Sequence, residues 1–328
     1  MNHDIIANTK DVDQPTEGHV EDLGQTDLQK STSILRGKIR ALVVTAYAMQ
    51  KLRIQCGLRL VANFRRDLGL KSSQSEDELD QDAKELIDNL RVSYGKITNA
   101  VVENTSIRKR KYKEFVGDGY ITDETELAMV RSFLDLEKNE KETFKELDVI
   151  IQKHPVYGFL KDVKGCGPAM SAVIISEIDI SRARYVSSLV MLAGLDVAPD
   201  GRGRSRVAEH LVDREYTGKD GELKTKKSIT YNPFLKTKLM GVLSGCIIKA
   251  GNKDGKNKYD KIYRDYKHRI ENHPNHKTKT PAHRNNMAKR YMIKIFLQDL
   301  YAYWRAVEGY EVHPPYHEAK LGIVHRPD

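Results

Sequence analysis

The chain has 328 residues, of which 39% are hydrophobic and 31% are charged, a balance typical of a protein with one or two folded domains and a well-solvated surface. No apolar run approaches the roughly 20 residues that cross a bilayer, and the N-terminus lacks a signal-peptide pattern. We therefore expect no membrane partner and a cytoplasmic location. Three distant cysteines, Cys56, Cys166 and Cys246, argue against a disulfide framework or a cysteine zinc site.

The net charge of +9 is unevenly distributed along the chain. Residues 1–200 carry 28 Lys and Arg against 32 Asp and Glu, whereas residues 201–328 carry 27 against 14, a net charge of +13. Lys and Arg that neutralise phosphates provide the sequence-independent part of nucleic-acid affinity. The last two-fifths are therefore expected to bind nucleic acid, with an acidic partner or a plain basic surface as the alternatives.

The N-terminal half is expected to be an acidic tail followed by helices. Residues 1–30 hold seven acidic side chains and two lysines, which predicts a disordered acidic tail that adds solubility or competes with nucleic acid for the basic half. In residues 31–152, apolar side chains recur at helical spacing over 33–68, 77–112 and 122–152. We interpret the last two stretches as an antiparallel helical stalk that could mediate homo-oligomerisation.

The sharpest local pattern is Lys164-Gly165-Cys166-Gly167-Pro168, which precedes an Ala/Ile/Val-rich helix. Glycines permit positive φ angles, and proline suits the first position of a helix. The free N–H groups at that helix start can receive an anion. The pattern resembles the helix-hairpin-helix element, which binds a DNA phosphate through backbone amides, and Lys164 would add a charge. The alternative is a glycine turn that joins two core helices.

A basic loop follows at Arg202-Gly203-Arg204-Ser205-Arg206. Its three guanidinium groups suit bidentate contacts to phosphate. A serine among arginines could also attack a phosphodiester while the arginines hold the developing charge, and His210 is a candidate general base. Ser205 is therefore the candidate catalytic residue, with a purely phosphate-binding loop or a solvated basic loop as the alternatives.

Further basic and aromatic residues lie downstream. The remaining expected DNA contacts are Lys226, Lys227, Lys289 and Arg290. Three tyrosines share a helical face and could stack on bases, although packing onto a neighbouring helix is the favoured interpretation: Tyr259, Tyr263 and Tyr266. A strong final helix is predicted over 285–307, with Trp304 in the core. No ligand spacing predicts a metal site, and no cofactor is evident.

Taken in order, these motifs resemble the helix-hairpin-helix-containing C-terminal domain of the DEDD-type, serine-dependent insertion-sequence transposases, the family that includes the bridge-RNA-guided recombinases. The likeness covers roughly residues 155–310 and rests on Gly-x-Gly-Pro, Leu-Ala-Gly-Leu at 192–195, Asn-x-x-Leu-Lys at 232–236 and the basic stretch 281–291. The resemblance implies a mainly α fold in which residues 153–328 form a transposase-type DNA-binding domain. It also implies DNA, or a DNA–RNA structure, as the partner in DNA transposition or recombination.

Two departures bear on the chemistry that the resemblance implies. The family's RuvC-like acidic domain is not evident in residues 1–75, so Mg²⁺ would enter only with a nuclease domain supplied in trans. The family's serine is commonly followed by glycine where this chain reads Asp200-Gly201, and Ser205 is the nearest serine. Whether the chain is an enzyme of DNA strand transfer stays open at this point. The alternatives are a non-catalytic DNA-binding or architectural protein and an accessory of a structure-specific nuclease.

Overall fold

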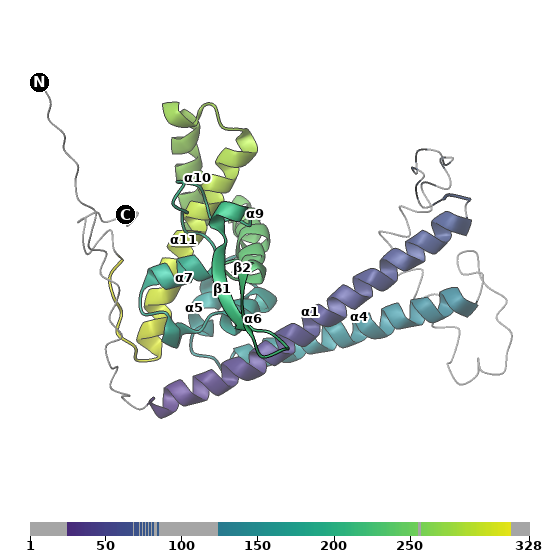
Figure 1. Ribbon diagram of the computed structural model, residues 1–328, viewed down its shortest axis with the longest axis horizontal. Helices are drawn as coiled ribbons and strands as arrows, with labels where there is room; N and C mark the ends of the chain where they lie inside the picture. The colour runs from purple at the N-terminus through teal and green to yellow at the C-terminus, as the bar shows by residue number, and fades with distance from the viewer. Residues whose placement is uncertain are drawn as a thin grey trace, which may run out of the picture.

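The computed structural model describes residues 25–67, isolated positions between 69 and 84, and residues 124–254 and 257–315. This part of the chain is mainly helical, with one antiparallel two-stranded hairpin (Figure 1). The mainly α fold class is thus confirmed. Within the described ranges, no helix combines the length and apolar character that crossing a membrane requires.

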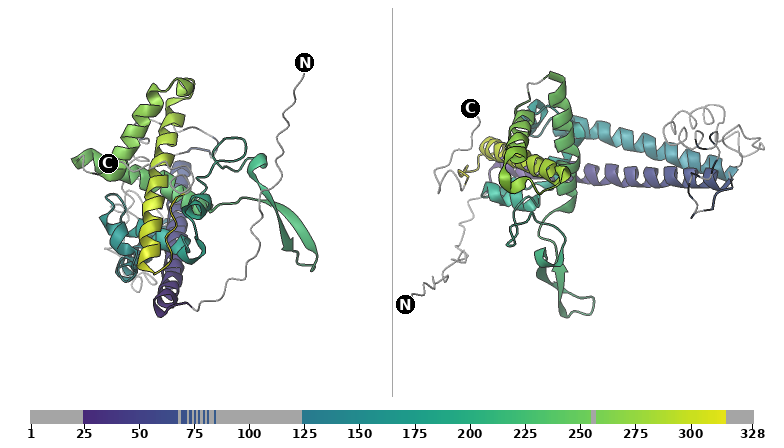
Figure 2. Two further views of the ribbon diagram at one scale, coloured as in Figure 1. Left: turned by 90° about the vertical axis from the view of Figure 1, so that its left-hand side faces the viewer. Right: turned by 90° about the horizontal axis from the view of Figure 1, so that it is seen from above.

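Two long helices form an arm that extends from the rest of the molecule (Figures 1 and 2). Helix α1 (Asp27–Asp67) runs antiparallel to α4 (Glu124–Ile151), and Arg53 on α1 donates to Glu140 on α4 at 2.6 Å. The sequence predicts a pairing of residues 122–152 with 77–112. That pairing stays a prediction, because 77–112 falls outside the described residues apart from isolated positions. The neighbour that the structure gives α4 is α1.

Helix α1 starts earlier than its apolar periodicity predicts. Thr26 Oγ1 accepts from the Gln29 amide at 3.3 Å, and Gln29 Oε1 accepts from the Thr26 amide at 3.1 Å. This reciprocal pair is a capping box, which satisfies two N–H groups at the helix start. The helix therefore begins at Asp27, within the stretch 1–30 that the sequence predicted as a tail; residues 1–24 lie outside the described part.

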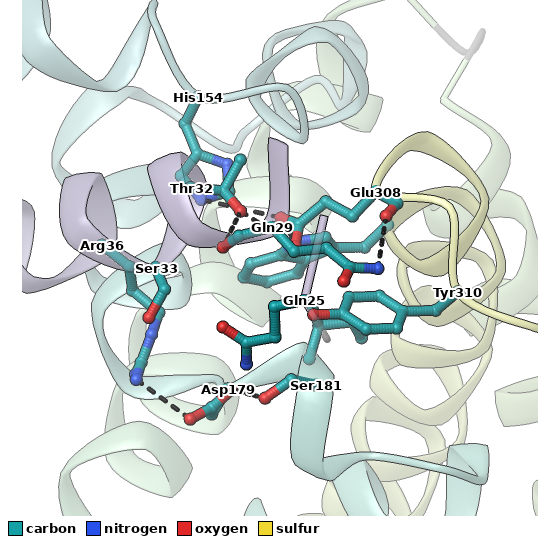
Figure 3. Close-up of a pocket in the computed structure, with 12 residues that line it drawn as sticks. Gln25, Gln29, Thr32, Ser33, Arg36, His154, Asp179, Ser181, Glu308 and Tyr310 are labelled. Carbon is teal, nitrogen blue, oxygen red and sulfur yellow. Dashed lines mark hydrogen bonds and ion pairs between the residues drawn. The ribbon is translucent and has the colours of Figure 1, made fainter. Parts of the chain in front are cut away.

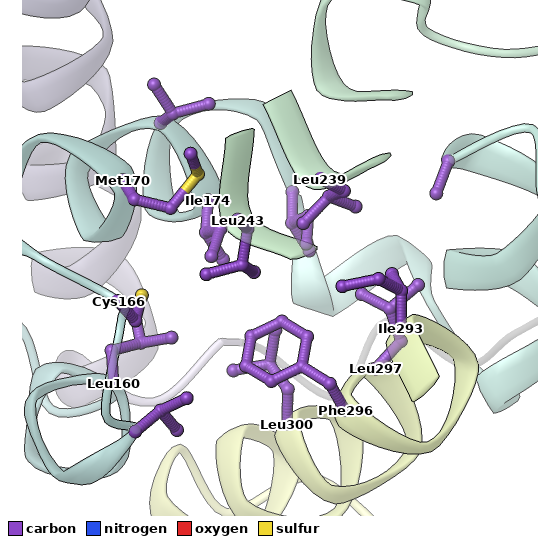
Figure 4. Close-up of a cluster of buried hydrophobic side chains, with 14 of the residues drawn as sticks. Leu160, Cys166, Met170, Ile174, Leu239, Leu243, Ile293, Phe296, Leu297 and Leu300 are labelled. Carbon is purple, nitrogen blue, oxygen red and sulfur yellow. The ribbon is translucent and has the colours of Figure 1, made fainter. Parts of the chain in front are cut away.

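The remaining helices pack around α6 and α11 into a body that comprises residues 155–254 and 257–310. Seven consecutive residues of α6, from Met170 to Ser176, are buried, which explains why this helix has no polar face. The core is drawn in Figure 4. The helices of the body are α5 (Tyr157–Asp162), α6 (Pro168–Glu177), α7 (Val186–Leu192), α8 (Pro233–Thr237), the π-helical η4 (Lys238–Leu243), α9 (Ser244–Asp254), α10 (Lys258–Asn272) and α11 (Pro281–Val307).

Aromatic side chains join α10 to α11. Tyr259 and Tyr263 are buried, and the Tyr266 ring stacks on Tyr291 with the centroids 4.0 Å apart. The tyrosine face predicted from the sequence therefore packs onto a neighbouring helix, as the favoured interpretation had it. Trp304 is also confirmed as a core residue, with 1% of its surface exposed.

A polar joint ties the start of α1 to the end of α11 (Figure 3). Trp304 Nε1 donates to Glu308 at 2.5 Å, and Thr32 Oγ1 donates to the other oxygen of the same carboxylate at 3.2 Å. The His154 ring stands edge-on to Trp304. Burial, followed by the nearby Arg36 charge, lowers the pKa of His154 to about 4, so this imidazole is neutral in the folded protein.

The β-hairpin was not predicted from the sequence. Strand β1 (Val212–Thr217) pairs with β2 (Leu223–Ser228), and the hairpin stands away from the helices (Figure 2). Both of its faces carry charged side chains, so the alternation of apolar and polar residues that marks a half-buried strand is missing. Short 3₁₀ turns, η2 (Ile180–Arg182), η3 (Ala208–His210) and η5 (Pro274–His276), complete the described elements.

Candidate functional site

The loop between α7 and β1 folds back on itself and brings distant polar groups together. The Arg204 amide donates to the Asp196 carbonyl at 3.1 Å, and the Ala198 amide donates to the Arg202 carbonyl at 2.7 Å. Gly201 sits at the tip with a φ of +76°, a left-handed conformation that glycine adopts without strain. This reversal places Asp200 beside η3, the turn that carries His210.

Ser205, His210 and Asp200 form a hydrogen-bonded chain, here called the Ser205 relay. Ser205 Oγ lies 2.9 Å from His210 Nδ1, and His210 Nε2 lies 3.2 Å from Asp200 Oδ2. The Ser205 amide also donates to Nδ1 at 3.0 Å. Nδ1 therefore acts as the acceptor, which leaves the ring proton on Nε2, facing the carboxylate. Asp200 Oδ1 accepts from the Arg202 amide, and this bond, followed by His210, lowers the pKa of Asp200.

The relay combines a buried imidazole with a more accessible hydroxyl. Only 3% of His210 is exposed, whereas Ser205 is half-buried. A base fixed by a carboxylate and within hydrogen-bond reach of a hydroxyl is the arrangement that activates serine nucleophiles. The distances are those of a serine–histidine–aspartate triad. In the usual triad Nε2 faces the serine and Nδ1 the aspartate, whereas here Nδ1 faces Ser205 and Nε2 faces Asp200.

Four cations from three segments lie beside the relay, one paired with the Asp196 carboxylate and three within reach of its charge. Arg204 donates through Nε and Nη2 to Asp196 at 2.9 and 2.8 Å. Lys236 Nζ donates to the Arg204 carbonyl at 2.6 Å, and Arg290 approaches the Asp196 carbonyl at 3.5 Å. Lys294 lies one helical turn after Arg290 on α11. These four side chains are called the cationic cluster below.

The electrostatics of the cationic cluster favour an added anion. Burial lowers the pKa of Lys236, Arg290 and Lys294, and the charge of Arg290 lowers the pKa of both lysines further. Asp196 acts in the opposite direction on all three groups. One carboxylate thus faces the four positive charges of the cluster, and Arg206 lowers the pKa of Lys236 as well. A bound phosphate would relieve the remaining repulsion.

The Gly-x-Gly-Pro turn between α5 and α6 uses its two glycines differently. Gly165 has a φ of +98°, and a methyl group there would lie 2.7 Å from the backbone of α9 at Cys246 and Ile247. The Cys166 amide donates to the Val163 carbonyl at 2.9 Å, and its side chain is buried. Burial raises the pKa of this thiol to about 11. Gly165 and Cys166 therefore fix the turn against the core.

Gly167 and Lys164 occupy the outer side of the same turn. Gly167 is exposed and caps α6 without a side-chain hydrogen bond, and Lys164 is exposed as well. The Lys164 carbonyl accepts from Asn257 at 3.0 Å, which anchors the turn from the body. A hollow of about 590 Å³ beside it is lined by Lys161, Lys164 and Lys258, together with carboxylates such as Asp299. Lys258 pairs with Asp299 at 2.8 Å.

The expected DNA-binding residues fall into three places rather than one. The turn at Gly167 lies at the N-terminal end of α6, whereas Glu177 at the other end accepts from Asn232, which neighbours the loop of the relay. Ten helical residues separate these ends by about 15 Å. Lys226 and Lys227 lie on β2.

The third place is the basic loop. The structure brings Arg204, Ser205 and Arg290 together there and places Arg202 and Arg206 on the exposed rim of the loop. Lys289 is half-buried and follows Ala288 next to Arg290.

Two functional groups were missed by sequence reasoning. The sequence shows Asp200 only at the place of the family's serine, because its pairing with His210 depends on the reversal at Gly201. Lys236 belongs to the Asn-x-x-Leu-Lys motif, and helical spacing alone does not indicate its partner. The Asn232 side chain caps α8 and so fixes the start of the helix that carries Lys236, whose Nζ then reaches the Arg204 carbonyl.

Among the residues that the structure covers, no group of three or more His, Cys, Asp or Glu side chains could hold a metal ion. Comparison with known proteins adds no relative: no family model matches the chain, and no curated protein or solved structure is significantly similar to it.

Proposed function

We propose that this protein binds DNA as a mobile-element protein of the transposase type, and that Ser205 is the nucleophile of a DNA strand-transfer reaction. The observation that carries the proposal is the 2.9 Å approach of Ser205 Oγ to His210 Nδ1 beside a cluster of four cations. The family resemblance in the sequence and the +13 charge of residues 201–328 support the same function.

In the proposed step, Ser205 Oγ attacks the phosphorus of a phosphodiester and gives its proton to His210 Nδ1. The bond from phosphorus to the leaving deoxyribose oxygen breaks, and that oxygen takes the proton from the imidazolium. The products are a serine phosphodiester and a free DNA hydroxyl. Attack by a hydroxyl of a second strand reverses the sequence and completes the transfer. Asp200 stabilises the imidazolium, and the cationic cluster offsets the charge on the phosphoryl oxygens.

One observation favours a second, non-catalytic function. His210 Nδ1 accepts from the Ser205 amide at 3.0 Å as well as from the hydroxyl, so the ring also locks the loop. In that case the loop and the cationic cluster bind DNA phosphates, and the protein acts as an architectural or accessory DNA-binding protein.

Partners follow from the same proposal. DNA, alone or in a DNA–RNA structure, would contact the cationic cluster. A second copy of the chain could pack along the two-helix arm, where α1 exposes Val44, Leu52 and Leu58.

A covalent-capture experiment separates the two functions. The protein is incubated with a nicked suicide duplex, and a protein–DNA adduct is sought on a denaturing gel. We expect an adduct with the unaltered protein and with Ser187→Ala, an exposed serine on α7 that serves as the control. We expect none with Ser205→Ala, which should still bind the duplex. DNA binding without an adduct would favour the non-catalytic function, in which His210 only holds the loop. If the unaltered protein does not bind DNA at all, both functions are wrong.

A further inference from the structure

The β-hairpin has two chemically different faces. Side chains alternate between the faces of a strand, so the register assigns each residue to one of them. One face holds only positive charges, around one aromatic ring, and is called the cationic face: Arg214, Tyr216, Lys224 and Lys226. The opposite face mixes signs, with Asp213, Glu215 and Lys227.

On the cationic face, Lys224 pairs with Asp220 of the turn, whereas no acidic side chain stands opposite Arg214 or Lys226. Arg214 stands directly opposite Lys226, whereas on the other face Asp213 stands opposite Lys227 and pairs with it at 2.8 Å. Like charges in register destabilise a strand pair, and an isolated two-stranded hairpin is only marginally stable in water. Lys226 Nζ lies 4.9 Å from the centroid of the Tyr216 ring, which holds it on this face. An anion along the face would remove the repulsion.

The shape and exposure of the hairpin fit the groove of a duplex. Every residue of both strands is exposed except Ser228, and the hairpin projects clear of the helices (Figure 2). Six residues of strand span about 20 Å, or roughly six base-pair steps. The major groove of B-form DNA is about 12 Å wide and admits a two-stranded β-ribbon, whereas that of A-form RNA is too narrow.

The chain path places the hairpin beside the reactive serine. Strand β1 begins two residues after His210, and β2 leads through Tyr231 and Asn232 to Lys236. The hairpin thus emerges between His210 of the Ser205 relay and Lys236 of the cationic cluster. A duplex that presents a phosphodiester to Ser205 would pass the base of the hairpin.

We propose that the cationic face of this hairpin lies in the major groove of duplex DNA next to the phosphodiester held at Ser205. The proposal rests on the proposed function insofar as DNA is the ligand of the relay. The hairpin would bind the duplex form of DNA specifically, which the basic loop at 202–206 does not do because phosphates occur in every form of DNA.

The first test compares two variants that each remove two positive charges from the hairpin. Arg214→Gln with Lys226→Gln leaves Lys224, which pairs with Asp220, as the one cation of the cationic face, and Lys219→Gln with Lys227→Gln removes charges from the turn and the opposite face. The proposal takes Lys227, which the sequence predicts as a DNA contact, out of the binding surface because it pairs with Asp213 on the opposite face. Binding of a fluorescent duplex is measured by anisotropy over a range of salt concentrations. The first variant should reduce the slope of log K against log salt by about 1.8, the value for two lost phosphate contacts, and the second should leave it unchanged. Equal changes in both would overturn the proposal.

The second test identifies the groove. Methylation of guanine N7, which lies in the major groove, should weaken binding of the unaltered protein but not of Arg214→Gln with Lys226→Gln. Interference from minor-groove adenine N3 methylation alone, or a preference for an RNA duplex, would overturn the proposal. If these tests fail while the Ser205 adduct still forms, only the placement of the hairpin is wrong. If the protein binds no duplex, the proposed function and the hairpin proposal both fall.

Discussion

Two glycine-containing loops of the body, residues 163–168 and 200–206, are held by opposite means. The first is fixed by packing and an uncharged hydrogen bond: Gly165 lies against the backbone of α9, and Asn257 donates to the Lys164 carbonyl. The second is fixed by charge: Arg204 is paired with Asp196, and Arg290 fills the space above Gly203. Replacing a charge or adding an anion should therefore alter the second loop and leave the first unchanged.

The difference shows that a conspicuous glycine pattern can mark a steric requirement at one loop while the polar groups of the candidate site lie at another. The Gly-x-Gly-Pro turn gave the sharpest sequence signal, and its first glycine is required because another helix backbone approaches it. The basic loop had no comparable pattern, yet its Ser205 lies within hydrogen-bond reach of His210 on η3, and its Arg204 belongs to the cationic cluster. The glycine that packing requires and the charged groups of the candidate site thus lie in different loops, so that a substitution can change one without the other.

The largest effect is expected from Gly165→Ala. A methyl group there meets the backbone of α9 at 2.7 Å, where no flexible side chain can give way, and the φ of +98° is strained for alanine. Overpacking and the left-handed conformation together should reduce the free energy of unfolding by about 3 kcal/mol. Urea unfolding followed by circular dichroism measures this loss, and a stability equal to that of the unaltered protein would show that α9 does not press on the turn.

A smaller loss should follow from Asp196→Asn, because Arg204 and its neighbours lose the carboxylate that offsets them. We expect the free energy of unfolding to fall by about 2 kcal/mol and to recover in part when inorganic phosphate is added. Thermal unfolding with and without phosphate measures both effects. Asp213→Asn is the control, since it breaks an exposed ion pair worth less than about 1 kcal/mol. Equal phosphate effects in both variants would argue against an anion site at the cationic cluster.

Gly203→Ala should affect binding more than folding. Its methyl group would lie 2.6 Å from the Arg290 guanidinium, which is the end of a flexible side chain and can move away. We expect a change in unfolding free energy below about 1 kcal/mol and a roughly fivefold weaker affinity for DNA, because Arg290 leaves the cluster. Calorimetric stability and anisotropy titrations on the same sample check the two halves of this prediction. Loss of stability without loss of affinity would contradict it.

The smallest effect is expected from Gly167→Ala in the same turn as Gly165. Gly167 has an ordinary φ of −76°, and an added methyl group would meet nothing within 4 Å. The reduced entropy of the unfolded chain and the weaker helix cap of alanine should nearly cancel, leaving a change below about 0.5 kcal/mol. Urea unfolding of this variant beside Gly165→Ala shows whether the two glycines differ in role. A large destabilisation would place the outer side of the turn against the core as well.

Periodicity was sufficient to predict the helices 33–68 and 285–307 because each has a long apolar face. It could not show that α4 packs on α1, since the choice between two similar amphipathic partners is a long-range property. The hairpin was not predicted because neither of its faces is buried, so its strands lack the alternation of apolar and polar residues. At the candidate site, Ser205 and Arg290 were found from residue type and charge, whereas Asp200 depends on a turn that brings it back to a histidine ten positions later.

The joint at Thr32, His154, Trp304 and Glu308 gives the protein an internal optical reporter. Trp304 is the only tryptophan of the chain, so the intrinsic fluorescence reports on the place where α1 meets α11. Because the pKa of His154 is lowered to about 4 from an ordinary value of 6.5, the unfolded chain takes up this proton first as the pH falls. Acidification through that window should cost up to about 3 kcal/mol of stability through His154. Burial raises the pKa of Glu308 in the same joint, which acts in the opposite direction. The emission of a single indole would follow the net effect without any label.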